Sequence, residues 1–178
     1  MTKRNIALAV VIGLLFAGAG VHFGAKAPIG KVPATAKAAG TTPDLFGRSL
    51  PDANGTPQNL AQWKGKPVVV NFWATWCAPC VQEMPELSAL QTEIAPRNVQ
   101  IVGIGIDSPT NIKDFAGKYK ITYPLYVAGM DGTELSRQFG NQAGGLPYTV
   151  LIGADGKVRK TYLGKLKMDE LRRDIAAL

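Results

Sequence analysis

The stretch Trp76-Cys77-Ala78-Pro79-Cys80 holds both cysteines of this 178-residue chain, and it closely follows the apolar run Val68-Val69-Val70-Asn71-Phe72-Trp73. We expect the run to form a buried strand that delivers Cys77 to the start of a helix. A helix start presents unpaired N–H groups and a partial positive charge, which favour a thiolate over a thiol. Two cysteines at this spacing can close and reopen a small disulfide, so the stretch predicts a redox-active pair.

Other uses of a cysteine pair fit the chain less well. A structural zinc site needs about four ligands, and besides the two cysteines the chain has a single histidine, His22, within an apolar stretch. Covalent haem attachment needs a histidine directly after the second cysteine, where this chain has Val81. A stabilising disulfide normally closes a longer loop. A copper or other metal site and a structural bridge remain the alternatives.

Composition limits the classes of function. Apolar residues make up 46% of the chain and charged residues 19%, which is enough to build a packed core in one domain with additional segments. The net charge is +7. Because no arginine-rich or aromatic-interleaved basic patch accompanies this charge, we expect no nucleic-acid partner.

The N-terminus carries a membrane signal. Two basic residues precede the chargeless run Ile6–Ala25, whose length of about 20 residues can cross a bilayer as a helix. We therefore expect residues 1–25 to be a membrane anchor that leaves the rest outside the cytoplasm. The alternative is a signal peptide cleaved near Ala17-Gly18-Ala19. The apolar run continues past that site, which favours the anchor, and both alternatives give a compartment where disulfides persist.

The remaining chain divides into a linker and one domain. Residues 26–42 are rich in Ala, Lys, Pro, Gly and Thr without apolar periodicity, which is typical of a flexible linker. The folded domain is predicted over 43–178. It should open with a hairpin whose strands, at Leu45-Phe46 and Gln58–Leu60, flank a turn at Asn54-Gly55.

Strands and helices then alternate. Apolar runs predict strands at 67–73, 99–106, 123–127, 148–152 and 157–162, and helical spacing predicts helices from Cys77 onward and at 110–120, 131–139 and 168–177. Pro85 lies inside the first helix, and the apolar spacing beyond it argues for a kink rather than an end. This order implies an α/β fold, with a central mixed β-sheet and helices on both of its faces.

The motifs resemble those of a known family. The run Asn71–Cys80, with Pro85 five residues on and Gly145-Leu146-Pro147-Tyr148-Thr149 much later, is similar to the thioredoxin superfamily. The N-terminal hairpin, the anchor and an inserted strand–helix element resemble its membrane-tethered extracytoplasmic branch, the TlpA, ResA and CcmG proteins. The resemblance covers roughly residues 43–178 and implies a thioredoxin-like fold.

The resemblance assigns roles within the cysteine motif. It implies that Cys77 is the attacking cysteine and that Cys80 is the resolving cysteine, buried one turn into the helix. Ala78 and Pro79 match the dipeptide that tunes the reduction potential in this superfamily.

A second set of residues matches the substrate-binding side. Pro147 matches the cis-proline that faces the cysteine pair, and Leu146 matches the residue whose backbone pairs with a bound substrate strand. Without the resemblance, Pro147 would be an ordinary turn residue at a strand start. Trp76 and the strip around Leu146 and Pro147 are expected to form the docking surface for substrates.

One departure from cytoplasmic thioredoxin concerns proton transfer. Asn71 stands where thioredoxin has a buried aspartate that shuttles protons for the resolving cysteine. The ResA-like branch instead places a glutamate three residues after the second cysteine, which here is Glu83. Because Cys80 and Glu83 lie on neighbouring positions of one helix face, a carboxylate there can take or give a proton during exchange. The alternative is a solvated helix residue.

Together these features predict an extracytoplasmic thiol-disulfide oxidoreductase. The resemblance implies a reductase of protein disulfides, such as those of apocytochrome c or the copper-site subunits of oxidases. A membrane thiol-electron donor of the DsbD or CcdA type would recharge it. We expect no cofactor besides the Cys77–Cys80 disulfide, and no metal.

Three other activities are considered. A disulfide donor uses the same motif, because the direction of exchange depends on the reduction potential. A peroxiredoxin-type peroxidase needs a threonine three residues before the reactive cysteine, where this chain has Ala74. The related copper chaperones use a wider cysteine spacing and a histidine, and residues 43–178 contain none.

Overall fold

A computed structural model describes residues 43–178 of the chain. The predicted anchor over 1–25 and the predicted linker over 26–42 lie outside the described residues. Among the helices of the described range, none combines the length and the hydrophobicity that crossing a bilayer requires.

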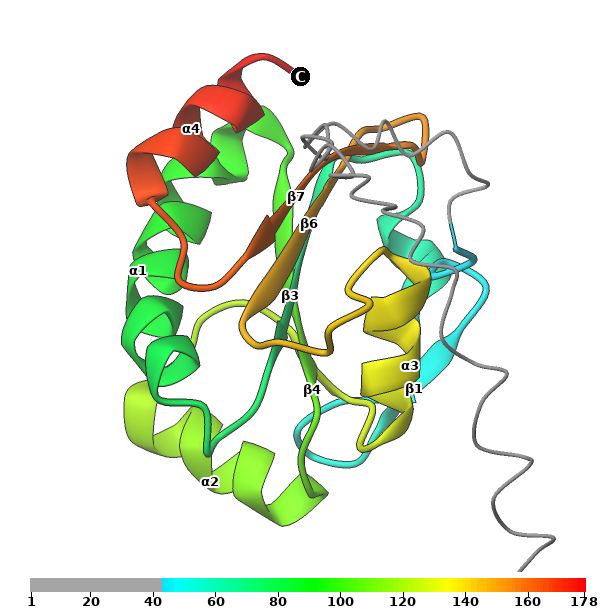
Figure 1. The fold of residues 1–178 in the computed structure, drawn as a ribbon, viewed down its shortest axis with the longest axis vertical. Helices are drawn as coiled ribbons and strands as arrows, with labels where there is room; N and C mark the ends of the chain where they lie inside the picture. Colours follow the sequence, from blue (N-terminus) through cyan, green and yellow to red (C-terminus); the bar gives the residue numbers. More distant parts are fainter. Residues whose placement is uncertain (1–42) are drawn as a thin grey trace, which may run out of the picture. The chain divides into compact units, whose positions relative to one another are not determined.

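The centre of the described domain is a mixed five-stranded sheet (Figure 1). Its strands, in spatial order, are β5 (Leu125–Val127), β4 (Gln100–Gly105), β3 (Val68–Trp73), β6 (Tyr148–Ile152) and β7 (Val158–Leu163). β3 pairs in parallel with β4, and β4 with β5, whereas β6 runs antiparallel to both β3 and β7. The predicted mixed sheet is therefore confirmed, with β3 at its centre.

Helices cover both faces of this sheet, as the alternation of elements predicted. Apolar side chains of α1 (Ala78–Ile94), α2 (Pro109–Tyr119) and α4 (Met168–Ala176) belong to one buried cluster. The opposite cluster receives side chains from α3 (Asp131–Gln138) and the 3₁₀ helix η1 (Leu60–Trp63). Figure 1 shows α1 and α4 on one side of the strands and α3 on the other. A second 3₁₀ turn, η2 (Ala95–Arg97), extends α1.

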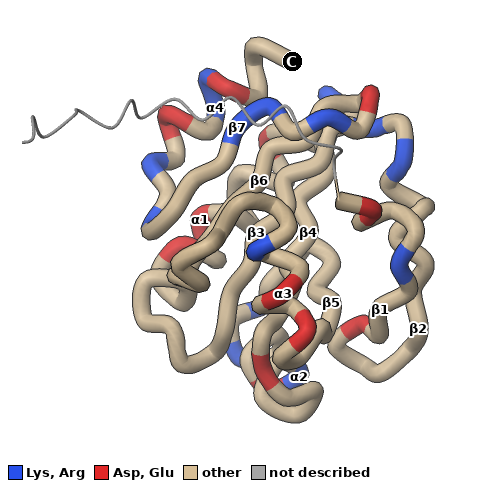
Figure 2. Tube along the Cα trace, turned by 45° about the vertical axis from the view of Figure 1, so that its right-hand side comes forward, with Lys and Arg blue, Asp and Glu red and all other residues tan. Residues whose placement is uncertain are grey.

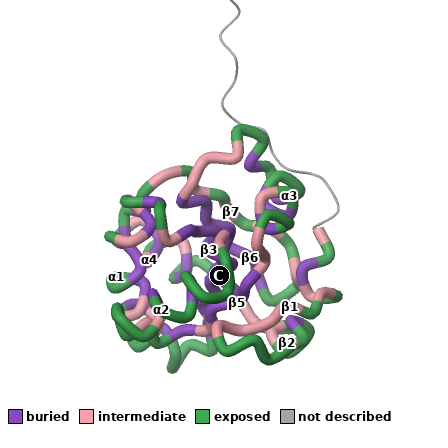
Figure 3. The backbone as a smooth tube through the Cα atoms, turned by 90° about the horizontal axis from the view of Figure 1, so that it is seen from below, coloured by how far each residue is buried: buried purple, intermediate pink, exposed green. Residues whose placement is uncertain are grey.

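The sequence of β3 follows from its position between two covered faces. All six of its residues are buried, as the buried central strands in Figure 3 illustrate. Val69 and Trp73 belong to the cluster on the α1 side, and Phe72 belongs to the opposite cluster. Because side chains alternate along a strand, Asn71 shares the α1-side face with Val69 and Trp73.

Helix α1 starts directly after the first cysteine. Cys77 is its N-cap residue, and Pro79 lies in the first turn, where a missing N–H costs nothing. The helix continues through Pro85 to Ile94, so the prediction that it extends beyond this proline is confirmed. Its buried side comprises Cys80, Glu83, Met84, Leu87, Leu90 and Ile94.

The predicted N-terminal hairpin is present, but its first strand begins later in the sequence than predicted. The hairpin pairs β1 (Ser49–Pro51) with β2 (Pro57–Asn59), whereas Leu45-Phe46 lies in a turn. The Asp44 side chain accepts a hydrogen bond from the amide of Gly47 at 2.8 Å, which curls the chain before the strand begins. The predicted turn at Asn54-Gly55 is confirmed, with Gly55 at a φ of 85°.

Candidate active site

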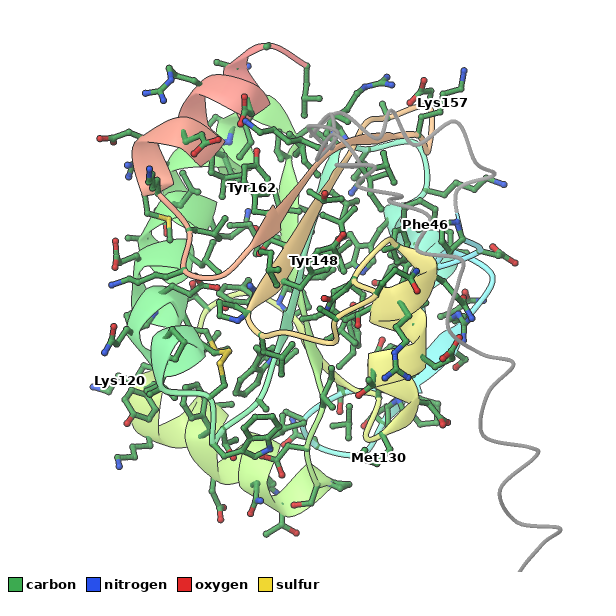
Figure 4. All side chains as sticks on the ribbon, in the orientation of Figure 1. Phe46, Lys120, Met130, Tyr148, Lys157 and Tyr162 are labelled. Atoms are coloured by element: carbon green, nitrogen blue, oxygen red, sulfur yellow. A yellow bond between two sulfur atoms is a disulfide. The ribbon has the colours of Figure 1, made fainter. Side chains whose placement is uncertain are left out.

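The two cysteines lie at the N-terminal end of α1 and are joined by a disulfide, the yellow bond in Figure 4. Their Cα atoms are 5.2 Å apart. After β3 the chain turns sharply, and the amide of Cys77 donates to the carbonyl of Ala74 at 3.2 Å. The Cys77 Sγ accepts a hydrogen bond from the amide of Cys80 at 3.3 Å. One N–H group of the first helical turn, that of Cys80, is therefore directed at the sulfur of Cys77.

The two sulfurs differ in their access to solvent. Cys77 keeps 6% of its surface exposed and Cys80 none, whereas the neighbouring Trp76 is 70% exposed. An incoming group would therefore reach Cys77 first, beside an open aromatic surface. Of the two residues between the cysteines, Ala78 is exposed and Pro79 is half-buried. Pro79 has no N–H, which leaves the amide of Cys80 as the donor to the Cys77 sulfur.

Glu83 lies one turn after Cys80 and is fully buried. Its Oε1 accepts a hydrogen bond from the Asn71 Nδ2 at 2.8 Å, and its Oε2 accepts one from the Leu166 amide at 2.9 Å. Burial raises the pKa of Glu83 to about 7, although both hydrogen bonds oppose the rise. The interpretation of Glu83 as a solvated helix residue is therefore wrong, because position 83 falls within the apolar side of α1.

A pair of buried polar residues on the sheet is hydrogen-bonded to Glu83 through Asn71. Asn71 on β3 and Thr149 on β6 are direct cross-strand partners, and both are fully buried. The Asn71 Nδ2 donates to the Thr149 Oγ1 at 3.0 Å as well as to Glu83. These strands are otherwise apolar, and Figure 2 shows that charged residues gather on the outer helices and loops rather than on β3, β4 or β5.

The loop before β6 carries the predicted substrate-binding residues. The Leu146–Pro147 peptide is cis, as the resemblance implied. Pro147 is buried, and Leu146 is half-buried and packs against both core clusters. A hydrogen bond from the Asn141 Nδ2 to the Gly145 carbonyl, at 2.9 Å, fixes this loop. Two residues after Pro147 comes Thr149, so the loop leads directly into the strand that carries one member of the polar pair.

A shallow apolar groove of about 520 Å³ adjoins Trp76. Its walls come from the turn before α1 and from the loops that follow β4 and β5, and they comprise Trp76, Ile106, Asp107, Ser108, Pro109, Val127, Ala128, Gly129 and Met130. Met130, labelled in Figure 4, is 80% exposed. The turn is fixed to this wall, because the hydroxyl and the amide of Thr75 donate to the Asp107 carboxylate.

Sequence reasoning missed part of this site. Asn71 and Thr149 were noted as motif residues without a contact between them, although a polar residue inside an all-apolar strand signals a specific partner. Asp107 could have been found, since it follows β4 as Thr75 follows β3, and parallel strands end at one edge of a sheet. The Leu166 amide carries no local signal, because 83 residues separate it from Glu83.

The site contains the parts needed for thiol chemistry. It combines a sulfur at a helix N-terminus, a second sulfur beneath it, and a buried carboxyl that titrates near neutral pH. Among the residues that the structure describes, no three His, Cys, Asp or Glu side chains come together in a way that could hold a metal ion.

Comparisons with known proteins point in one direction. The Redoxin family model matches residues 24–177. The thiol-disulfide oxidoreductase ResA of Geobacillus thermodenitrificans is 31% identical over 178 residues, which covers 99% of this chain and 97% of that protein.

Solved structures agree with the sequence comparison. A thiol:disulfide interchange protein of the thioredoxin family from Chlorobium tepidum superimposes with a TM-score of 0.63 at 32% identity, over 73% of this chain and 91% of that one. A secreted disulfide oxidoreductase of Mycobacterium tuberculosis, homologous to DsbE of E. coli, gives 0.63 at 27% identity over 75% and 97%. The fold is therefore thioredoxin-like, as the resemblance implied.

Proposed function

Because this chain belongs to the Redoxin family and is a thiol-disulfide oxidoreductase, we propose that Cys77 and Cys80 are its redox couple and that it reduces disulfides in proteins. The observation that carries the proposal is the unequal setting of the two sulfurs. Cys77 caps a helix and keeps 6% of its surface exposed, whereas Cys80 is fully buried one turn from Glu83. One sulfur is suited to attack an outside disulfide and the other to finish the reaction internally.

The first step is attack by the reduced enzyme. The Cys77 thiolate attacks one sulfur of the substrate disulfide, the substrate S–S bond breaks, and a mixed disulfide forms. The departing substrate sulfur leaves as a thiolate and takes a proton from solvent. The helix N-terminus and the Cys80 amide favour the charged form of Cys77 before the attack.

The second step releases the substrate. Cys80 loses its proton and attacks the Cys77 sulfur, which closes the Cys77–Cys80 disulfide and frees the second substrate thiolate. Two electrons have then passed from the enzyme to the substrate. We assign the removal of the Cys80 proton to Glu83, since a base with a pKa of about 7 is suited to the task at neutral pH.

The docking surface in this proposal combines Trp76 with Leu146 and Pro147. An extended substrate segment would pair with the backbone at Leu146, and its apolar side chains would occupy the groove beside Trp76. Ala78 and Pro79 tune the reduction potential through the geometry of the first helical turn. No cofactor besides the disulfide takes part.

The cellular setting belongs to the same proposal. Residues 1–25 would anchor the chain, or direct its export if they are cleaved, and residues 26–42 would link them to the domain over 43–178. A DsbD- or CcdA-like membrane protein would supply electrons. The substrates would be apocytochrome c before haem attachment, or a copper-site subunit of an oxidase. The ResA relative and the DsbE homologue support an oxidoreductase of this kind.

The reduction potential of the Cys77–Cys80 couple tests the direction of exchange. Equilibration of the purified protein with defined ratios of reduced and oxidised dithiothreitol or glutathione, followed by thiol alkylation, measures it. We expect a value near that of thioredoxin, about −270 mV. A value near that of a strong oxidant, about −120 mV, would overturn the reductase assignment in favour of a disulfide donor.

A further inference from the structure

The carboxylate of Glu83 is held from two directions by neutral donors. Asn71, from the sheet beneath α1, binds Oε1 at 2.8 Å, and the Leu166 amide, from the loop between β7 and α4, binds Oε2 at 2.9 Å. We propose that Asn71 is a positioning residue, which fixes the carboxyl group of Glu83 for proton exchange with Cys80. This inference rests on the proposed role of Glu83, and it extends that role to a residue that touches neither sulfur in the proposed reaction.

The position of Asn71 is suited to this role. It points to the α1 side of β3 together with Val69 and Trp73, so an apolar residue would be the simple choice for packing. An apolar side chain would leave Oε1 of Glu83 buried without a donor. The amide instead uses one N–H for Glu83 and the other for the Thr149 Oγ1. Asn71 therefore connects the carboxyl group to β6, the strand that follows Pro147.

The remaining polar atom of Asn71 also bears on proton exchange. Its Oδ1 is buried and has no hydrogen-bond partner among the described residues. With both N–H groups engaged, this orientation suits an ionised Glu83. A half-turn of the amide would bring Oδ1 against Glu83, which is favourable only when the carboxyl group carries a proton that it can donate. The Thr149 hydroxyl can accept or donate, so Asn71 can adapt to both protonation states, but it stabilises the ionised one more, because hydrogen bonds to a charged group are stronger than those between neutral groups.

The other titratable groups near Glu83 have weaker effects on its ionisation. Lys165, beside Leu166, lowers the pKa of Glu83, and Glu86, one turn away on α1, raises it. These two form an ion pair with each other at 3.8 Å, with side chains 46% and 51% exposed, so solvent screens their effect. The hydroxyl of the buried Tyr123 is neutral, because burial and the charge of Glu83 both raise its pKa. Asn71 is the buried side chain that contacts the carboxylate directly.

The decisive experiment follows the ionisation of Glu83 itself. In the oxidised protein both cysteines are in the disulfide and do not titrate. There, ¹³C NMR of the glutamate carboxyl groups gives the pKa of Glu83, whose signal is identified by its absence in Glu83→Gln. We expect Asn71→Ala to raise this pKa by about one unit, because a donor to the charged form is lost. An unchanged pKa in a folded Asn71→Ala protein would overturn the inference.

A matched control is available in Asn141. It is also a buried asparagine with an unpartnered Oδ1 among the described residues, but its amide serves Ser136 and Gly145 instead. Asn141→Ala should therefore destabilise the fold in a similar way and move the pKa of Glu83 by less than about 0.3 unit. An equal shift in both variants would mean that general loosening, rather than the contact with Asn71, is responsible.

A second variant keeps the test decisive if Asn71→Ala does not fold. Asn71→Asp has nearly the same shape but brings a second carboxyl group to about 3 Å from that of Glu83. The two groups should then share one proton, with one pKa raised by about two units or more, on the order seen for paired carboxylates. Independent titration, with the pKa of Glu83 unchanged from about 7 in the wild-type protein and that of the introduced carboxyl group near its usual value, would contradict the contact.

The pH profile of disulfide exchange separates this inference from the proposed function. If Asn71 acts through Glu83, Asn71→Ala should move the inflection of the second step, release of the mixed disulfide, upward by the shift seen in the NMR titration. If the NMR pKa moves and the profile does not, Asn71 controls the ionisation of Glu83, but the proton-transfer role of Glu83 fails, and the positioning role for that transfer fails with it. If neither moves, the positioning role fails while the cysteine chemistry remains untouched.

Discussion

The two sulfurs belong to two contrasting regions. The outer region, formed by Trp76, Cys77 and the groove beside them, reaches the surface, since Trp76 is 70% exposed and Cys77 keeps 6% of its surface exposed. The inner region, formed by Cys80, Glu83, Asn71 and Thr149, is fully buried and polar. Exposure suits the outer region to meet a partner, and burial suits the inner region to shift a pKa. One disulfide joins the two regions, so in the proposed mechanism substrate contact and proton control are separated within a single turn of helix.

The regions are also built differently. In the outer region, Trp76 and Cys77 depend on one continuous stretch, because β3, the turn and the N-cap of α1 follow one another in sequence, and the loops after β4 and β5 add the other groove walls. The inner region assembles side chains from α1, β3 and β6 with an amide from the loop before α4. In the proposed mechanism, local sequence therefore controls attack, and the packing of distant elements controls proton exchange. Substitutions in the two regions should differ accordingly.

Substitution of the cysteines should have the largest effect. Cys77→Ser should lower the rate of insulin disulfide reduction by at least about 10³-fold, because the attacking sulfur is gone. Cys80→Ser should lose turnover but still attack, and so accumulate a mixed disulfide with a protein substrate, visible on a non-reducing gel. Mixed disulfides that form through Cys80 in the Cys77→Ser protein would reverse the assignment of outer and inner sulfur.

The inner region should impose a pH dependence on stability. The pKa of Glu83 is raised from 4.5 to about 7 in the fold, so between these values the folded state binds more protons than the unfolded state. Stability should therefore fall as pH rises through this window, by up to about 3 kcal/mol from this group. Urea unfolding of the oxidised protein from about pH 4.5 to about pH 8 measures it. Glu83→Gln should remove this contribution to the fall of unfolding free energy with pH. If the unfolding free energies of the two proteins changed in parallel with pH, the raised pKa of Glu83 would be contradicted.

Glu83→Gln should also slow catalysis without blocking the first step. Loss of a positioned base is expected to slow release of the mixed disulfide on the order of 10²-fold near neutral pH. Alkylation of Cys77 by iodoacetamide in the reduced protein should change far less, and rapid-quench kinetics resolve the two steps. Glu86→Gln, on the exposed side of the same helix, serves as the control. Equal slowing of both steps would mean that the two regions are not separate.

Trp76→Ala should have the smallest of these effects and act only on large substrates. Trp76 is 70% exposed, so its removal should change the free energy of unfolding by less than about 0.5 kcal/mol. Loss of one aromatic contact should slow insulin reduction about tenfold and leave the reduction of a small aromatic disulfide unaffected. Leu178→Ala, which removes an exposed apolar side chain outside the groove, is the matched control. A similar loss with both substrates would place Trp76 in the chemistry instead.

Much of the molecule was predictable because its signals are local. The apolar run of β3, the helical spacing of Met84, Leu87 and Leu90, and the turn at Asn54-Gly55 each depend on residues within a few positions of one another. The first strand of the hairpin was misplaced for the same reason. Leu45-Phe46 has the composition of a strand, but Asp44 closes a turn over it, and local hydrogen bonding outweighed β-propensity.

By itself, the sequence determined the cysteine pair, its place at a helix start, the order of strands and helices, and the family to which the chain belongs. Only the tertiary structure decided that Glu83 is buried, which atoms hold its carboxyl group, and which cysteine keeps some exposure to solvent. The physical reason is that a helix start or a strand is set by neighbouring residues, whereas the environment of a charge is set by whatever packs around it. For Glu83 that environment includes a strand 12 residues before it and a loop 83 residues after it.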